Sequence, residues 1–261
     1  MKLADAFASV TRRRPAFIPY VMAGDPDMET TAAVLRALAS AGATAIELGI
    51  PYGDPLADGP TIAAAGVRAL AAGATVEAVL ALVARIAPEI SASIVLFTYF
   101  NPLERYGLER FARDAAQAGA AGAIVPDIPL EESEELRAIF AHHGVDVPML
   151  VAPSTPPERA AKIAAASRGF LYVVSRLGVT GAGSEPDFAP LRSQLSTLRA
   201  ATDLPIALGF GVSRAEHVRA VAGEVDAVIV GSALIDALAG LRGTDAAAAT
   251  TRFVDELFSG S

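Results

Sequence analysis

Eight short apolar segments recur along the chain, each followed by a turn rich in Gly, Pro or Asp and then by an alanine-rich amphipathic stretch. The eight expected strands are residues 17–23, 44–50, 93–99, 121–127, 147–153, 169–175, 204–210 and 226–232. Near-continuous apolar strands that alternate with helices are typical of a parallel sheet covered on both faces. Eight such units in 261 residues favour an α/β fold of the closed (β/α)8 type, a TIM barrel. An open doubly wound sheet is the alternative.

The domain organisation follows from the same pattern. No linker, low-complexity tract or change of composition interrupts residues 1–261, so we expect one barrel domain over this length. An extra N-terminal helix is expected at residues 2–10, where it would cap the bottom of the barrel. Active sites of such barrels lie at the C-terminal ends of the strands. Functional residues are therefore expected at the tails of the eight strands.

Composition excludes several classes of function. The formal net charge of −8 disfavours nucleic acid or an anionic membrane as the main partner, because these bind basic surfaces. Cysteine is absent, which excludes thiolate nucleophiles and cysteine-ligated metals. The two lysines, Lys2 and Lys162, lie outside the expected strands, so a Schiff-base mechanism lacks its nucleophile. The three histidines fall in expected helices or at their ends, which places them on the surface rather than in a metal site. Acid–base chemistry by carboxylates remains, with no cofactor and no metal.

The N-terminal segment and the overall hydropathy bear on location. In MKLADAFASVTRRRP the arginines follow the short apolar stretch and Asp5 interrupts it, which indicates an amphipathic helix rather than a signal peptide. No segment approaches the roughly 18 continuous apolar residues of a membrane-spanning helix. We therefore expect a cytoplasmic protein.

The segment ELGIPYGDPLADGP (47–60) carries the first candidate site. Period-two alternation over 44–50 points Ala45, Glu47 and Gly49 into the barrel. Glu47 would then lie in an apolar interior near a strand end, where burial favours its protonated form, as a general acid/base requires. The alternative is an interior Glu paired with a nearby Tyr or backbone group. Asp58 follows on the loop and could reach the same cavity, although taken alone it is better explained as a turn residue.

Three glycine-rich turns form the second candidate site. They are SRLGVTGAG (175–183), GFGVS (209–213) and GSAL (231–234), at the tails of the last three expected strands. In many barrels a phosphate binds at the last two of these loops, since glycine lets backbone N–H groups approach the anion. The alternative is ordinary tight turns. The first of the three is also long enough for a lid over a substrate, or for a disordered surface loop.

Several separated motifs together resemble one known family. They are PYVMAGDP (19–26), ELGIPYGDPLADGPTI (47–62), NPLERYG (101–107), PDIPLEES (126–133), SRLGVTGA (175–182), GFGVS (209–213) and GSAL (231–234). In this order, over nearly the whole length, they resemble the tryptophan synthase alpha chain family. The resemblance implies a retro-aldol cleavage of indole-3-glycerol phosphate to indole and glyceraldehyde 3-phosphate. It makes Glu47 the proton shuttle and Asp58 the partner of the indole nitrogen.

The resemblance also implies the substrate contacts. Residues expected to line the indole slot are Tyr20, Ile62, Phe97, Ile124 and Tyr172. Residues expected around the phosphate are Gly181, Gly209, Phe210, Gly211, Gly231 and Ser232. Thr180 in the lid would contact Asp58 on closure. Gly53, Ala63 and Phe97 depart from the residues that the family more often has at these positions.

A beta subunit is the partner that the resemblance implies, in an α2β2 heterotetramer. Pro51, Asp54 and the segment 101–107 would face it, while Asp25 would be structural. Two alternatives keep the family: a stand-alone lyase that releases free indole, or a weakly active regulatory subunit that activates a beta chain. A phosphosugar isomerase on the same barrel is a further alternative, but it leaves the apolar slot unexplained.

Overall fold

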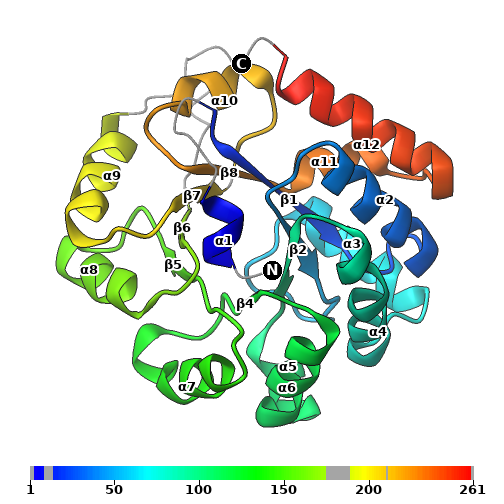
Figure 1. The fold of residues 1–261 in the computed structure, drawn as a ribbon, viewed down its shortest axis with the longest axis horizontal. Coiled ribbons are helices and arrows are strands. Elements are labelled where there is room, and N and C mark those ends of the chain that lie inside the picture. The colour runs from blue at the N-terminus through cyan, green and yellow to red at the C-terminus, as the bar shows by residue number, and fades with distance from the viewer. Residues whose placement is uncertain (1–2, 9–13, 175–188, 210, 260–261) are drawn as a thin grey trace.

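A computed structural model of the chain describes residues 3–8, 14–174, 189–209 and 211–259. Parallel strands form its centre and helices surround them (Figure 1). The strands are β1 (Ala16–Met22), β2 (Ala45–Gly49), β3 (Ser93–Phe97), β4 (Gly122–Ile124), β5 (Met149–Val151), β6 (Leu171–Val174), β7 (Ile206–Gly209) and β8 (Ala227–Val230). The helices are α1 (Leu3–Phe7), α2 (Met28–Ser40), α3 (Pro60–Ala71), α4 (Val76–Ile86), α5 (Phe100–Tyr106), α6 (Leu108–Ala118), α7 (Glu134–His142), α8 (Pro157–Ala166), α9 (Ala189–Ala201), α10 (Ala215–Val221), α11 (Ser232–Leu238) and α12 (Gly243–Leu257), with 3-10 turns at Ala87–Glu89 and Leu130–Glu132.

The strands close into a barrel. Their order is β4-β3-β2-β1-β8-β7-β6-β5, and every pair is parallel. The two ends of this order meet where Gly122 bridges Asp146, just before β5. Backbone bonds from Ala123 N to Asp146 O (2.8 Å) and from Asp146 N to Ala121 O (3.0 Å) complete the ring. The expected (β/α)8 barrel is confirmed, and the open sheet is wrong.

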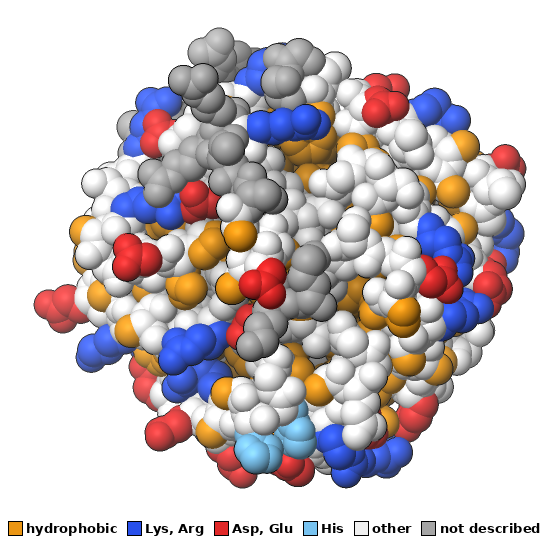
Figure 2. Space-filling model, in the orientation of Figure 1, with side chains coloured by type: hydrophobic (Ala, Val, Ile, Leu, Met, Phe, Trp, Pro, Cys, Tyr) orange, Lys and Arg blue, Asp and Glu red, His pale blue; other side chains and the backbone are white. Residues whose placement is uncertain are grey.

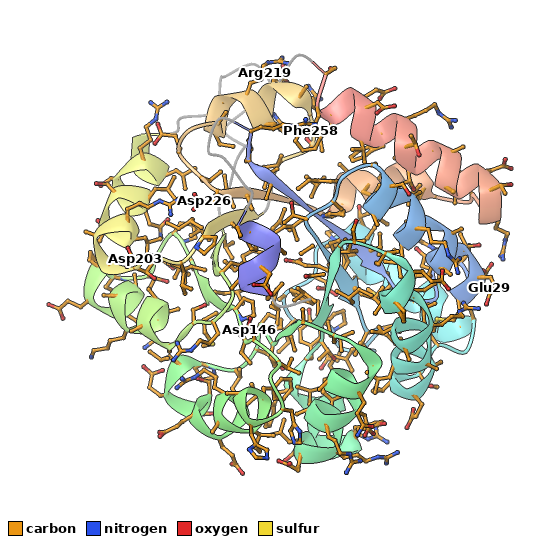
Figure 3. The ribbon with its side chains drawn as sticks, in the orientation of Figure 1. Glu29, Asp146, Asp203, Arg219, Asp226 and Phe258 are labelled. Carbon is orange, nitrogen blue, oxygen red and sulfur yellow. The ribbon has the colours of Figure 1, made fainter. Side chains whose placement is uncertain are left out.

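Local sequence signals set the helix ends. Asp27 caps α2 by accepting a hydrogen bond from Thr30 N at 2.7 Å, and Thr75 caps α4 by accepting one from Ala78 N at 3.2 Å. α6 ends at Gly119, whose φ of 94° lies in the left-handed region. At the N-terminal ends of the strands, Asp226 (Figure 3) accepts a bond from Ile206 N at 2.7 Å and pairs with Arg199, which ties α9 to the barrel.

Apolar side chains form two layers, one on each side of the barrel wall. Outward residues such as Ile46 and Leu48 pack under the helices. Inward residues such as Ala45, Val95 and Phe97 fill the interior. This is the alternation expected for residues 44–50, and it places Glu47 on the inner side.

Helix α1 lies across the bottom of the barrel (Figure 1). Leu3 is fully buried in the inner core, and the Phe7 ring lies 5.8 Å from that of Phe170. Gly169 makes room for it, since a Cβ there would stand 2.6 Å from Leu3 Cδ1. The expected N-terminal helix is therefore confirmed as α1, which passes into a turn at Ala8, whose N–H bonds to Asp5 O at 3.3 Å. Residues 2, 9 and 10 of the expected range lie outside the described residues.

Within the described residues, no single helix is long and apolar enough to cross a membrane. Only Pro60–Ala71 and Val76–Glu89 taken together have the length and composition, and they meet at a bend of 97°.

Replacing Leu3 by Ala tests whether α1 is part of the cooperative core. The change removes a fully buried side chain at the barrel floor, so we expect the free energy of unfolding to fall by roughly 2–5 kcal/mol. Leu70→Ala is the matched control, because this helical Leu is 39% exposed and its loss should cost about 0.5 kcal/mol or less. Urea titration of both variants measures the difference. Equal losses would mean that α1 packs only loosely under the barrel.

Candidate active site

A cavity of about 130 Å³ opens at the C-terminal ends of the strands. Nine residues expected from the sequence line it: Tyr20, Glu47, Asp58, Ile62, Phe97, Tyr172, Gly211, Gly231 and Ser232. Five further described residues also line it: Ala57, Val212, Ser213, Ile229 and Ala233. Carboxyl groups, aromatic rings and glycine-rich turns that lie far apart in the sequence thus meet at one end of the barrel.

Glu47 lies on β2 with Tyr20 of β1 and Val95 of β3 as its register partners. It is 1% exposed, and its Oε1 has no hydrogen-bond partner among the described residues. Burial raises the pKa of Glu47 to about 8, so the neutral carboxyl dominates at neutral pH. An unpaired, protonated carboxyl at a cavity wall is suited to give a proton and take one back. The alternative of a carboxyl fully paired with a Tyr or the backbone is not what the structure has.

Asp58 lies on the loop between β2 and α3, and its carboxylate is tied to the residue two positions after β3. The hydroxyl of Tyr99 donates to Asp58 Oδ1 at 2.8 Å and accepts from Ala57 N at 3.1 Å. Burial raises the pKa of Asp58, and the bond from Tyr99 opposes that rise. Burial also raises the pKa of Tyr99, and the bond to Asp58 adds to the effect, so the phenol keeps the proton that it donates.

Aromatic rings form the apolar wall of the cavity. The Tyr20 and Phe97 rings meet edge to face with centroids 5.6 Å apart. Gly49 leaves room for the first ring, since a Cβ there would stand 2.2 Å from Tyr20 Oη. Gly209 does the same for Tyr172, with a Cβ distance of 2.4 Å to Oη.

Two of the residues expected to touch substrate lie behind the cavity wall. Gly209 ends β7 beneath the Tyr172 ring, where it makes room for that ring. Ile124 is fully buried beside Phe97, with which it pairs in register, and packs in the inner core. Neither lines the cavity. Thr180, Gly181 and Phe210 lie outside the described residues.

Glycine-rich backbone after β7 and β8 also lines the cavity. Gly211 has a φ of 91°, which a residue with a side chain rarely adopts, and Gly231 immediately precedes α11. Ser213 N donates to His217 Nδ1 at 3.2 Å, so His217 of α10 supports this loop. Its side chain is 21% exposed, so this histidine is half-buried at the surface. Groups of three or more His, Cys, Asp or Glu that could hold a metal do not occur in the described part of the chain.

Tyr99 is the residue that motif reasoning missed. It lies two positions after Phe97, so strand alternation directs both toward the same side. That signal was present in the expected strand 93–99, but the hydrogen bond to a loop 41 residues earlier was not readable from it.

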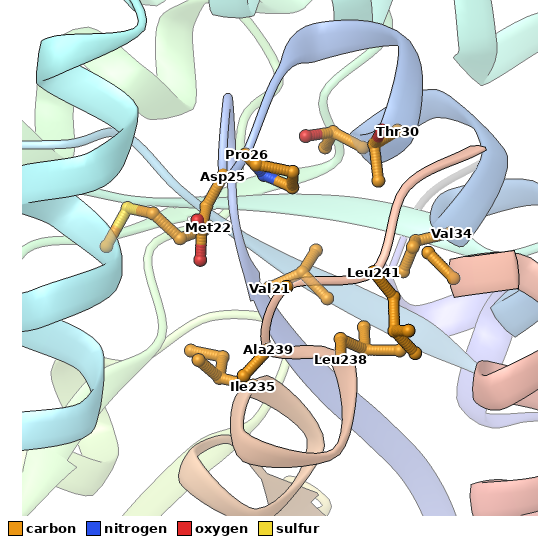
Figure 4. Close-up of a pocket in the computed structure, with 13 residues that line it drawn as sticks. Val21, Met22, Asp25, Pro26, Thr30, Val34, Ile235, Leu238, Ala239 and Leu241 are labelled. Carbon is orange, nitrogen blue, oxygen red and sulfur yellow. The ribbon is translucent and has the colours of Figure 1, made fainter.

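A second cavity, between the loop after β1 and helix α11, is a different kind of site (Figure 4). It holds about 30 Å³ and, among the residues that the structure describes, shares no lining residue with the first. Its carboxylate, Asp25, is held by Arg68 Nε and Nη2 at 2.8 and 2.7 Å. Asp25 is thus neutralised in a structural ion pair, as expected.

Surface charge on the described part of the face in Figure 2 is mixed, with Lys and Arg scattered among Asp and Glu around the rim.

Comparison with known proteins gives one family. Residues 7–257 match the model of the tryptophan synthase alpha chain. The tryptophan synthase alpha chain of Gloeobacter violaceus is 50% identical over 240 residues, covering 91% of this chain and 87% of the relative. That of Chloroflexus aggregans is 45% identical over 260 residues, covering 99% and 97%.

Solved structures agree. Tryptophan synthase from M. tuberculosis superposes with a TM-score of 0.86 at 37% identity, over 99% of this chain and 97% of that one. Tryptophan synthase subunit alpha from Legionella pneumophila has a TM-score of 0.89 at 32% identity, over 99% and 97%. The chain therefore belongs to the tryptophan synthase alpha chain family and is a carbon–carbon lyase that cleaves indole-3-glycerol phosphate in tryptophan biosynthesis.

Proposed function

We propose that Glu47 and Asp58 carry out this cleavage, Glu47 by moving protons and Asp58 by holding the indole nitrogen. The observation that carries the proposal is their placement on one cavity in two different environments. Glu47 is buried with an unpaired oxygen, whereas Asp58 is partly exposed and accepts a hydrogen bond. One carboxyl is thus kept neutral and the other is supported as an anion.

The bond that breaks joins indole C3 to the first carbon of the glycerol phosphate. Protonation of C3 by Glu47 turns the ring into an iminium-like electrophile. The resulting carboxylate then takes the proton of the hydroxyl on that first glycerol carbon, the one bonded to C3. The C–O bond becomes C=O, the C–C bond breaks, and its electron pair returns to the ring. Glu47 ends the cycle protonated, and Asp58 stabilises the positive charge on N1 while it lasts.

The rest of the cavity fits the two ends of this substrate. Tyr20, Phe97 and Tyr172 offer flat apolar walls for indole, with Ile62 of α3 at the side. The backbone at Gly211, Gly231 and Ser232 offers N–H donors for the phosphate. Thr180, Gly181 and Phe210 remain predicted contacts.

We also propose that the chain works with a beta subunit in an α2β2 heterotetramer. Relatives solved as tryptophan synthase, and as its subunit alpha, support such a partner. The loop that carries Asp58 also carries the exposed Asp54 and Leu56, the latter 78% exposed, on the side expected to face it. A weakly active regulatory subunit would not need an intact Glu47–Asp58 pair, and this argues against that alternative.

Two further expectations remain proposals. One domain over residues 1–261 is supported by the packing of α12 against α2, which joins the C-terminal and N-terminal parts. Arg242 Nη1 meets Asp27 Oδ2 at 2.6 Å, and Gly243 N bonds to Thr30 Oγ1 at 3.1 Å in the same contact. The cytoplasmic location remains a prediction.

Glu47→Gln tests the proton shuttle. Gln keeps the shape of the side chain but cannot exchange a proton, so kcat for indole release should fall by about 10²–10⁴-fold with a small change in KM. Steady-state assay of indole-3-glycerol phosphate cleavage measures it. Glu77→Gln, a change on α4 away from the cavity, is the control and should leave kcat unaltered. If Glu47→Gln cleaved the substrate at the wild-type rate, Glu47 would not be the proton shuttle.

Stability against pH tests the protonation state of Glu47 independently of activity. The unfolded chain loses this proton above pH 4.5, whereas the folded chain holds it to about pH 8. Wild type must therefore lose stability relative to Glu47→Gln as the pH rises, by roughly 3 kcal/mol between pH 5 and pH 8. Urea titrations of both proteins across this range measure the difference. A constant difference would show that Glu47 ionises at an ordinary pKa.

Asp54→Ala tests whether the Asp58 loop transmits partner binding. We expect the variant to keep its basal lyase rate and to lose stimulation by the beta subunit, because Asp54 is exposed on that loop and absent from the cavity. Asp255→Ala on α12 serves as the control. Lyase rates with and without the beta subunit measure the effect, and unchanged stimulation would count against the proposed interface. A wild-type chain that is fully active alone would instead support a stand-alone lyase.

A further inference from the structure

We infer that Tyr99 is a positioning residue for Asp58: its hydroxyl holds the carboxylate in the place where it meets the indole nitrogen. The inference rests on the role proposed above for Asp58. It adds a residue from the turn between β3 and α5 to a reaction centre otherwise built from β2 and the loop after it.

The hydroxyl joins a fixed part of the barrel to an exposed loop. Tyr99 is 2% exposed, whereas Asp54, Leu56 and Ala57 in the loop are exposed. Its Oη makes two bonds to adjacent loop residues, to Asp58 Oδ1 at 2.8 Å and from Ala57 N at 3.1 Å. Two bonds in opposite senses fix both the position and the rotation of the loop at this point.

The Tyr99 ring is itself held in place. Its centroid lies 5.4 Å from that of Tyr52 and 6.5 Å from that of Phe97, which in turn packs edge to face on Tyr20. A row of rings therefore runs from the barrel interior to the loop.

The backbone on both sides of Tyr99 is also anchored. Thr98 N bonds to Ile124 O at 3.0 Å, and Phe100 N bonds to Asp127 Oδ1 at 2.9 Å. Tyr99 stands at the N-cap of α5 between these two bonds. The phenol is thus a rigid donor, and the loop is the part that adapts to it.

The two carboxylate oxygens of Asp58 differ in their hydrogen bonds. The phenol occupies Oδ1, and in the described part of the chain Oδ2 has no such bond and is available to an indole N–H. A carboxylate fixed by one oxygen presents the other in a defined direction, which lowers the cost of ordering it around the substrate.

Tyr99→Phe removes the hydroxyl and keeps the ring. We expect kcat/KM for cleavage to fall about tenfold, because Asp58 loses a hydrogen bond to its charged form and Ala57 N–H loses its acceptor. The acid limb of the pH profile should move to higher pH, since the lost bond lowers the pKa of Asp58. Tyr52→Phe, which alters a ring packed on the same site, is the control and should stay within about twofold. Urea titration checks that both variants fold.

A double-mutant cycle with Asp58→Asn separates positioning from a direct contact. The readout is the Kd of indole-3-propanol phosphate, a substrate analogue that cannot be cleaved, so inactive variants are measurable. Tyr99→Phe should weaken binding about tenfold with Asp58 present, and less than about twofold when it is combined with Asp58→Asn.

Equal weakening in both backgrounds would overturn the inference, because the hydroxyl would then act by itself. The same holds if Asp58→Asn weakens binding and Tyr99→Phe does not. If Asp58→Asn binds and cleaves like the wild type, the proposed role of Asp58 fails, and the inference fails with it.

Discussion

The site depends on one costly feature, an uncompensated carboxyl in the wall of an apolar barrel. Glu47 is held there by a strand that pairs on both sides, with β1 through Tyr20 and with β3 through Val95. A shift of one residue in this register would turn Ile46 or Leu48 inward and send the carboxyl under the helices. The two apolar layers fix the register, because each buries only its own set of side chains. The stability of the barrel is thus what maintains a protonatable group in a low-dielectric place.

The shape of the cavity follows from pairs of large and small residues on neighbouring strands. Gly49 lies under Tyr20 and Gly209 under Tyr172, and in each pair a methyl group would overlap the phenol. The rings can therefore lie flat at the strand ends instead of turning out of the barrel. Phe97 takes part in the same wall through its edge contact with Tyr20. A flat apolar slot and an acid at its side are then produced by the same few strand ends.

Features of the fold and the site that depend on local sequence patterns could be predicted from the sequence. Period-two alternation correctly predicted that Glu47 points into the barrel. The rule that active sites lie at the C-terminal ends of barrel strands correctly predicted that Asp58 and Gly231 lie at the same cavity. Contacts between distant segments were not readable, since no periodicity encodes them. The bond from Tyr99 to Asp58 is one such contact. The packing of Gly209 against a ring is another, because a glycine at a strand end is equally compatible with a phosphate loop. Where the structure describes them, strand ends were also predicted too far out, because apolar residues continue into the turns after the ladder has ended.

Asp58, on the loop after β2, is connected to the expected partner face in two ways. Along the chain, Asp58 is four residues from the exposed Asp54. Across the fold, the phenol that holds Asp58 belongs to the N-cap residue of α5, and α5 with Gly107 contains the segment 101–107 expected to face the beta subunit. Both connections meet at the hydrogen bond from Tyr99 to Asp58. A partner that shifts either the loop or α5 therefore changes the distance between Tyr99 and Asp58 before it reaches Glu47, whose strand is fixed on both sides. Of the two carboxyl groups, the one on the loop is the one that binding at this face can adjust.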